Sequence, residues 1–499
     1  MKKRISLKSI FTLIILPVIF FFQNGEKAFA QTNSFSCEGA VYTEHINLCN
    51  NYLKSYLQQQ ITDRLINKSD VYALYDIQIY LQSTLEMARR CKKTTLIREI
   101  RSLLEISFNK LEAFSSKDKS PAWICRGGNI CNNTNKLLNS EVLLCSVQFL
   151  GLLAAEAQAL ASLNEPLTGD DIKFINKSVE IIFSHLKRWE SQGEISSQKI
   201  LALIPIKKQM VSEKSGSQYF YSDKALWATT IYAELAGLLQ NPLFFNQHKN
   251  NLTIVAKKHF NLLIKLFLSR HSVEILNNKK VSDIDAGYWR FYTDNRYANY
   301  ASSMKPVSCT KDKNGQWIKT VNVAKGSVPL DQNAGWDISH ARRLVPFFDS
   351  LTNNKNFLQT VFNNLTVGDI NSISETQESF QNKLSEVIWN QNEAYPLFSN
   401  FWNGKNGWYR VAYDNGTQQC VEGFSPSGLS FSVPTGGFLS WNQNQQIKKI
   451  GQNLYNLSLS LDKTDIDFVN QNYSQISSSS NSIVNKINRF MFLASVISN

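Results

Sequence analysis

Two segments of this 499-residue chain are apolar on almost every side of a helix, and they constrain the fold more than any other feature. The first begins near Ser140, and the second covers residues 223–239, with Ser222 or Asp223 as its candidate N-cap. A helix without a polar face has to be enclosed by other helices. The sequence therefore predicts a protein built from packed layers of helices.

Amphipathic helices alternate with these enclosed segments. Apolar residues recur at spacings of three and four in residues 52–111, 170–189 and 252–268. A ring of helical hairpins requires such an alternation, because its inner helices touch neighbours on every side. We expect a mainly α protein, with one (α/α) toroid domain over residues 31–499 and a small β or loop insertion. No strict sequence period supports the ring, so an α-solenoid is the alternative.

The second half of the chain changes character after residue 277. Residues 310–328 alternate and contain turn residues, which predicts a β-hairpin or a long loop. Helical patterning resumes at Asp337, and Pro346 should kink that helix. Later helices are predicted at 357–365, 380–389, 445–461 and 483–497. We expect the loop-rich regions around 283–343 and 390–437 to carry function, because binding and catalytic residues concentrate on loops.

Residues 1–30 have the form of a secretory signal. Lys2, Lys3 and Arg4 form a basic start, residues 10–22 are apolar, and Ala28-Phe29-Ala30 has the small-x-small form that a signal peptidase cuts. The apolar run is shorter than the roughly 20 residues that cross a bilayer. We predict cleavage near Ala30, export to the periplasm or beyond, and no stable membrane insertion.

The chain is basic, with a formal net charge of +13 at pH 7. A positive field concentrates anionic partners such as acidic polysaccharide, although solubility alone is an equally good explanation. The basic stretches are short and no nucleic-acid-binding module is recognisable, so we expect no nucleic-acid partner.

The eight cysteines all follow the predicted leader. An even count in an exported chain favours disulfides, but it does not fix their connectivity. The plausible pairs are Cys37–Cys49, Cys125–Cys131 and Cys309–Cys420. The histidines show no close pairing, and none lies near Cys125 and Cys131. We therefore expect no metal site and no cofactor.

Residues 335–343 form the first candidate site. With Asp337 as N-cap, His340 falls in the first turn of a helix, where unpaired backbone N–H groups favour an anion. Arg342 follows within one turn and can bind a carboxylate through two parallel hydrogen bonds. Trp336 is a candidate binding residue beside them. The ordinary alternative is a capping aspartate, a solvated arginine and a structural histidine.

Residues 285–300 form a second cluster, in which aromatic rings alternate with charges. Aromatic rings stack on the apolar faces of sugars, so this mixture is typical of a saccharide cleft. Core packing would explain any single ring, but it does not require the charges alongside. The candidate residues are Asp285, Trp289, Arg290, Tyr292, Asn295 and Arg296. Residues 393–431 form a third cluster, which we consider the second most important source of site residues. Its candidates are Trp408, Arg410 and Glu422.

Helical hairpins together with these three clusters resemble the carbohydrate-active enzymes built on (α/α) toroids. These are polysaccharide lyases of the alginate-lyase and heparinase kind, and helical-ring glycosidases. Such lyases use a tyrosine and a histidine for proton transfer, and an asparagine or arginine to neutralise the uronate carboxylate. The resemblance implies these roles for residues of the right types here, namely Tyr292, His340, Asn295 and Arg342.

Three functions remain open at this point. The first is β-elimination on an acidic polysaccharide, which needs a base and cations that stabilise the enolate. The second is glycoside hydrolysis on an acidic or neutral polysaccharide, which needs two carboxyl groups about 5 to 10 Å apart. Its candidates are Asp285, Asp294, Asp337, Asp414 and Glu422. The third is a non-catalytic saccharide- or surface-binding protein. For each function we expect a monomer.

Overall fold

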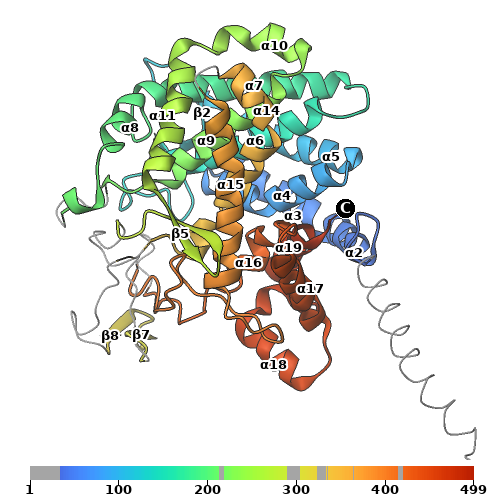
Figure 1. The fold of residues 1–499 in the computed structure, drawn as a ribbon, viewed down its shortest axis with the longest axis vertical. Helices are drawn as coiled ribbons and strands as arrows, with labels where there is room; N and C mark the ends of the chain where they lie inside the picture. The colour runs from blue at the N-terminus through green and yellow to red at the C-terminus, as the bar shows by residue number, and fades with distance from the viewer. Residues whose placement is uncertain are drawn as a thin grey trace, which may run out of the picture.

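The structure is a computed structural model that describes residues 34–212, 218–288, 304–322, 333, 335–362, 365–413 and 420–498. It is mainly helical, as the sequence predicts (Figure 1). The predicted leader, residues 1–30, lies outside the described residues.

Both enclosed segments are helices, α6 (Leu143–Ala161) and α9 (Asp223–Leu238), and nearly all their residues are buried. The side chain of Ser222 caps α9, as predicted. The two helices pack against each other so closely that a Cβ on Gly151 would lie 2.4 Å from the Trp227 ring. By length and composition α6 could cross a membrane. However, 89% of its apolar stretch is buried inside the protein, as expected for a core helix.

The long inner helices follow one another in space. Helix α4 (Tyr72–Arg90) packs between α6 and α19 (Ile483–Val496), and α9 packs between α6 and α13 (Leu344–Asn353). The short helix α16 (Ser432–Thr435) packs against α19 and against α12 (Ile338–Ala341). Their buried apolar side chains form one continuous core.

Amphipathic helices cover these inner helices. They are α5 (Thr94–Glu105), α7 (Gly169–Ser191), α11 (Ile254–Arg270), α15 (Val367–Lys383) and α17 (Gln445–Leu459). Capping boxes fix the starts of α7 and α15, through Thr168 with Asp171 and Thr366 with Asp369. The remaining α-helices are α2 (Ala40–Leu48), α3 (Lys54–Gln59), α8 (Ser197–Leu203), α10 (Pro242–His248), α14 (Lys355–Val361) and α18 (Lys463–Asn472).

Strands form only antiparallel pairs among the described residues. Two longer hairpins are β5 (His271–Leu276) with β6 (Lys279–Ile284), and β7 (Val307–Lys311) with β8 (Trp317–Val321). The second matches the hairpin expected in 310–328, whereas the first was not predicted. Two short pairs are β1 (Glu112–Ala113) with β2 (Pro121–Ala122), and β3 (Ile124–Cys125) with β4 (Ser140–Glu141).

Pro346 does not kink a helix, contrary to the prediction. The chain instead breaks between α12 and α13, and Pro346 falls in the first turn of α13. A backbone N–H has no intrahelical partner there, so its absence in proline costs nothing.

Three disulfides link Cys37 to Cys91, Cys125 to Cys131, and Cys309 to Cys420. The second and third were predicted. The pair Cys37–Cys49 is wrong, because Cys37 joins the end of α4 while Cys49 is buried as a free thiol, as is Cys145. Three disulfides fit an extracellular or otherwise oxidising compartment.

Candidate functional site

Asp337 is the centre of the candidate site, because one carboxylate both caps a helix and holds a histidine. Its Oδ1 accepts hydrogen bonds from the backbone N–H groups of Ser339 at 3.0 Å and His340 at 3.2 Å. Its Oδ2 accepts from Nδ1 of the His340 ring at 2.5 Å. The capping geometry that the sequence predicts therefore fixes the orientation of the imidazole as well.

A tyrosine and an arginine from the loop-rich third cluster complete this arrangement. The Tyr409 hydroxyl donates to Asp337 Oδ2 at 2.8 Å, and Nε of Arg410 donates to the Tyr409 hydroxyl oxygen at 3.1 Å. Tyr409 is held by a two-way backbone bridge to Phe424. Arg410 has a φ of 55°, an uncommon conformation for a residue with a side chain. Two clusters far apart in the sequence thus meet at one carboxylate.

These contacts set the protonation states of the pair. Burial alone would raise the pKa of Asp337, but His340, Arg410 and Ser339 hold that pKa well below its usual range. Burial lowers the pKa of His340, with help from Arg343 and Arg410 and against the opposing charge of Asp337. At neutral pH the carboxylate is therefore ionised and the imidazole neutral. Because Nδ1 carries the proton donated to Asp337, the lone pair lies on Nε2, which can act as a base.

Arg343 ties the site to the starts of the inner helices. Its guanidinium donates to the Tyr75 hydroxyl of α4 at 2.8 Å and to the Gln148 side chain of α6 at 3.3 Å. It also lies 3.6 Å from a carboxylate oxygen of Asp223 at the start of α9. Arg342, next to it, is only partly buried. One end of the helix layer thus presents a cluster of guanidinium groups and phenols beside His340.

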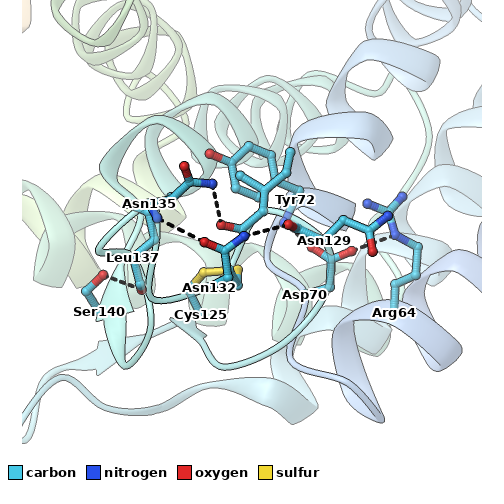
Figure 2. The surroundings of a disulfide bond; sticks show 11 residues. Arg64, Asp70, Tyr72, Cys125, Asn129, Asn132, Asn135, Leu137 and Ser140 are labelled. Atoms are coloured by element: carbon cyan, nitrogen blue, oxygen red, sulfur yellow. Dashed lines mark hydrogen bonds and ion pairs between the residues drawn. A yellow bond between two sulfur atoms is a disulfide. The ribbon is translucent and has the colours of Figure 1, made fainter. Parts of the chain in front are cut away.

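A small disulfide loop packs against the end of α4 that carries Tyr72 and Tyr75. Figure 2 shows the Cys125 loop beside Asp70, which accepts hydrogen bonds from Arg64 at 2.9 Å and from the Tyr72 backbone at 3.1 Å. A Cβ on Gly128, whose φ is 89°, would lie 2.5 Å from the Asp70 carboxyl carbon. The glycine is needed for this close approach, which fixes where α4 begins.

A narrow cavity of about 40 Å³ is lined by Arg342 and Arg343 together with Glu86 and Asp349. It has room for water but not for a sugar ring. A wider cavity of about 510 Å³ lies at the other end of α4 and is also lined by Glu86. His340, Arg342 and Arg410 are each partly exposed at the surface beside the smaller cavity.

The structure separates the predicted site residues into three groups. Asp337, His340, Arg342 and Arg410 come together, and the half-buried Trp408 precedes Tyr409. Trp289, Arg290, Tyr292, Asn295 and Arg296 lie outside the described residues, as do Asp294 and Asp414. Asp285, Trp336 and Glu422 are placed elsewhere.

Asp285 and Trp336 lie in the core, contrary to the roles predicted for them. Asp285 is fully buried, accepts a hydrogen bond from the Tyr221 backbone and lies 3.6 Å from Arg270. Trp336 is 1% exposed and stacks on Tyr221. Neither side chain is open to a saccharide in this conformation, so we remove both from the candidate site.

Glu422 has a structural position at the surface. Its carboxylate pairs with Lys305 at 2.6 Å and accepts from the Cys309 backbone at 2.9 Å, which attaches β7 to the loop that carries the Cys309–Cys420 disulfide. Among the described residues, Glu422 forms no hydrogen bond or ion pair with Asp337 or His340.

The sequence did not single out Tyr75 and gave Tyr409 no role, whereas Arg343 was expected, with Arg342, to add positive charge beside His340. The only signal for Tyr75 was an aromatic residue early in an amphipathic segment. Among the described residues, no group of three or more His, Cys, Asp or Glu side chains is placed to hold a metal ion. No family model, curated protein or solved structure matches this chain.

Proposed function

We propose that this chain is an exported enzyme that cleaves an acidic polysaccharide by β-elimination. The observation that carries the proposal is the hydrogen-bonded series from Arg410 through Tyr409 to Asp337 and His340. It supports a neutral histidine with a fixed tautomer beside several arginines. Proton removal next to a carboxylate requires such a base and such cations.

The proposed scaffold is an (α/α) toroid. Support comes from the order of packing, in which α19, α4, α6, α9 and α13 are successive neighbours and α16 lies against α19 and α12. Outer helices cover the inner ones, as a ring of hairpins requires. Because α4 and α9 begin beside Arg343, the proposed site lies at one end of the ring.

In the proposed reaction, Nε2 of His340 removes the proton from the carbon next to the uronate carboxylate. Arg342 or Arg410 stabilises the negative charge that develops on that carboxylate. The electron pair then forms a carbon–carbon double bond, and the glycosidic C–O bond breaks. The departing oxygen receives a proton from a phenol, for which Tyr75 is the described candidate and Tyr292 the one predicted from the sequence.

Glycoside hydrolysis is the second candidate, and one observation favours it. Glu86 and Asp349 line the same narrow cavity. Burial and the Glu86 charge raise the pKa of Asp349 to about 7, which suits a general acid. The cavity would have to open to admit a sugar, whereas His340 is already partly exposed, so we rank elimination first.

The test is to incubate the purified protein with alginate, glycosaminoglycans and pectin and to follow ultraviolet absorbance. Elimination produces an unsaturated uronate that absorbs, and hydrolysis produces reducing ends without that absorbance. We expect His340→Gln to lower the rate at least about 100-fold. The matched control is His248→Gln, because His248 is also partly buried but its hydrogen bond among the described residues is to Asn176 in α7. Binding of a polymer without any product would instead establish a saccharide-binding protein.

A further inference from the structure

The corner between α10 and α11 combines exposed apolar side chains with lysines. This α10–α11 corner, residues 242–258, contains α10, a 3-10 turn (Lys249–Asn251) and the start of α11. Ile254 is 86% exposed and Val255 51%, and Leu243 and Phe245 are exposed as well. Single exposed apolar residues are ordinary, but a group of four within one corner indicates a contact surface.

The same region has no negative charge of its own. Between Glu234 and Glu274 the chain contains no aspartate or glutamate, while Lys249, Lys258 and Lys265 are exposed. Along the outer face of α11, Ile254, Lys258, Lys265 and Leu268 recur at helical spacing. The corner therefore fits a partner that is both anionic and able to accept apolar side chains.

A groove of about 680 Å³ extends this surface onto α7. Lys173, Lys177 and Lys187 line it from α7, and His248 and Asn251 line it from the corner. The hydrogen bond of 2.9 Å between His248 and Asn176 holds the corner against α7. Two of these lysines are paired with acids, Lys177 with Glu180 and Lys173 with Asp170, so the positive charge of this surface comes mainly from the lysines of α11 and the corner.

We infer that the α10–α11 corner is a docking surface for an anionic phospholipid membrane. Lysines attract anionic headgroups, and exposed apolar side chains enter the interfacial layer. The most exposed apolar residues, Ile254 and Val255, are branched aliphatics, which stack poorly on sugars, so a polysaccharide fits less well. A second copy of the chain fits less well too, because a symmetric contact would bring the same lysines together.

The position of the corner gives the docking a direction. Helix α9 starts at Asp223, beside Arg343 of the candidate site, and ends at Leu238, directly before α10. Its length separates the two ends by roughly 24 Å. In Figure 1, α10 lies at the top of the molecule, far from β7 and β8. A membrane bound at the corner would therefore lie at the end of α9 opposite to the candidate site.

The test measures co-sedimentation of the protein with vesicles of phosphatidylcholine, with and without phosphatidylglycerol. We expect binding only to the anionic vesicles, and release at high salt. Ile254→Asp should weaken binding at least about tenfold. This variant should fold, because an aspartate at the first position of α11 suits the helix dipole. Lys249→Gln and Lys258→Gln should each weaken binding about fivefold.

The matched control is Leu461→Asp, since Leu461 is 92% exposed and lies between α17 and α18. It should bind vesicles like the unaltered protein, as should His340→Gln, which separates docking from the proposed catalysis. Equal binding to both vesicle types overturns the inference. Retention of binding by Ile254→Asp also overturns it. Competition between soluble heparin and the vesicles, with binding by Ile254→Asp retained, would make the surface a polysaccharide site.

Discussion

Two polar clusters lie within the helical body, and they differ in how far they are closed. The Asp337 cluster lies where loops meet the starts of α4 and α9, and the His340 side chain there is 14% exposed. The Glu234 cluster is enclosed by helices near the C-terminal ends of α4, α6, α9 and α13, and Glu234 there has no exposed surface; we call it the central cluster. Glu234 is bonded directly by the cation Arg89, whereas Asp337 accepts, among the described residues, only from neutral donors and has Arg410 behind Tyr409.

The central cluster joins four inner helices. Glu234 of α9 accepts from Arg89 of α4 at 3.2 and 3.3 Å, and from Ser350 and Asn354 at the end of α13. Arg89 also donates to Gln158 of α6. A Cβ on Gly237 would lie 1.8 Å from the Asn354 side-chain oxygen, so glycine is required for this packing. The central cluster fixes the helices, whereas the Asp337 cluster orients a base near solvent.

The largest expected effect is on the closed cluster. Arg89→Met leaves Glu86 and Glu234 buried without their cation, and it should lower the free energy of unfolding by about 3 to 5 kcal/mol. Denaturant titration measures the change. The control is Lys449→Met, which removes an exposed ion pair with Glu393 and should cost at most about 1 kcal/mol. Similar values for both variants would show that the central cluster is no more important than a surface pair.

A second prediction uses the opposite pH behaviour of Asp337 and of Asp349, a carboxyl whose ionisation the charges of Glu86 and Glu234 oppose. Burial and Glu86 raise the pKa of Asp349 to about 7, so this group stabilises the fold at low pH and the contribution is lost as pH rises from about 4 to about 7. Asp337 has a lowered pKa, so its contribution is present above about pH 4 and is lost as pH falls further.

Between pH 4 and pH 7, ionisation of Asp349 should lower the free energy of unfolding by at most about 4 kcal/mol. Asp349→Asn should remove this part of the pH dependence. Denaturant titrations at several pH values give the slope. Glu393→Gln, at an exposed position, is the control and should leave the slope unchanged. An unaltered slope in Asp349→Asn would mean that this carboxyl is ionised throughout the range.

The contrast between the clusters also shows what the sequence could predict. The enclosed helices α6 and α9 were predictable because burial on every side leaves an apolar composition. The contact between Asp337 and His340 could be predicted because the two residues lie within one helical turn of each other. Tyr75 and Tyr409 come to the site from distant parts of the chain, and a local sequence pattern does not predict such long-range contacts.

Two misses have different origins. Cys37 lies closer in sequence to Cys49 but pairs with Cys91, because the end of α4 returns to α2 in space. The β5–β6 hairpin was missed because almost all of β5 is exposed and gives no alternation. Its turn residues Asn277 and Asn278, with φ of 51° and 60°, were the available signal.

The last prediction tests whether the open cluster orients a base. Asp337→Asn should keep the helix start, since asparagine caps as well as aspartate, but it removes the charge that raises the His340 pKa. We expect kcat/KM on the uronate polymer to fall about 100-fold, because asparagine no longer favours the Nδ1–H tautomer. The remaining activity should lose its acid limb at a lower pH. Ser339→Ala, which removes another donor to Asp337 but leaves the His340 bond, should cost less than about tenfold. If Asp337→Asn and Ser339→Ala behave alike, the carboxylate only caps the helix, and the two clusters differ in exposure rather than in role.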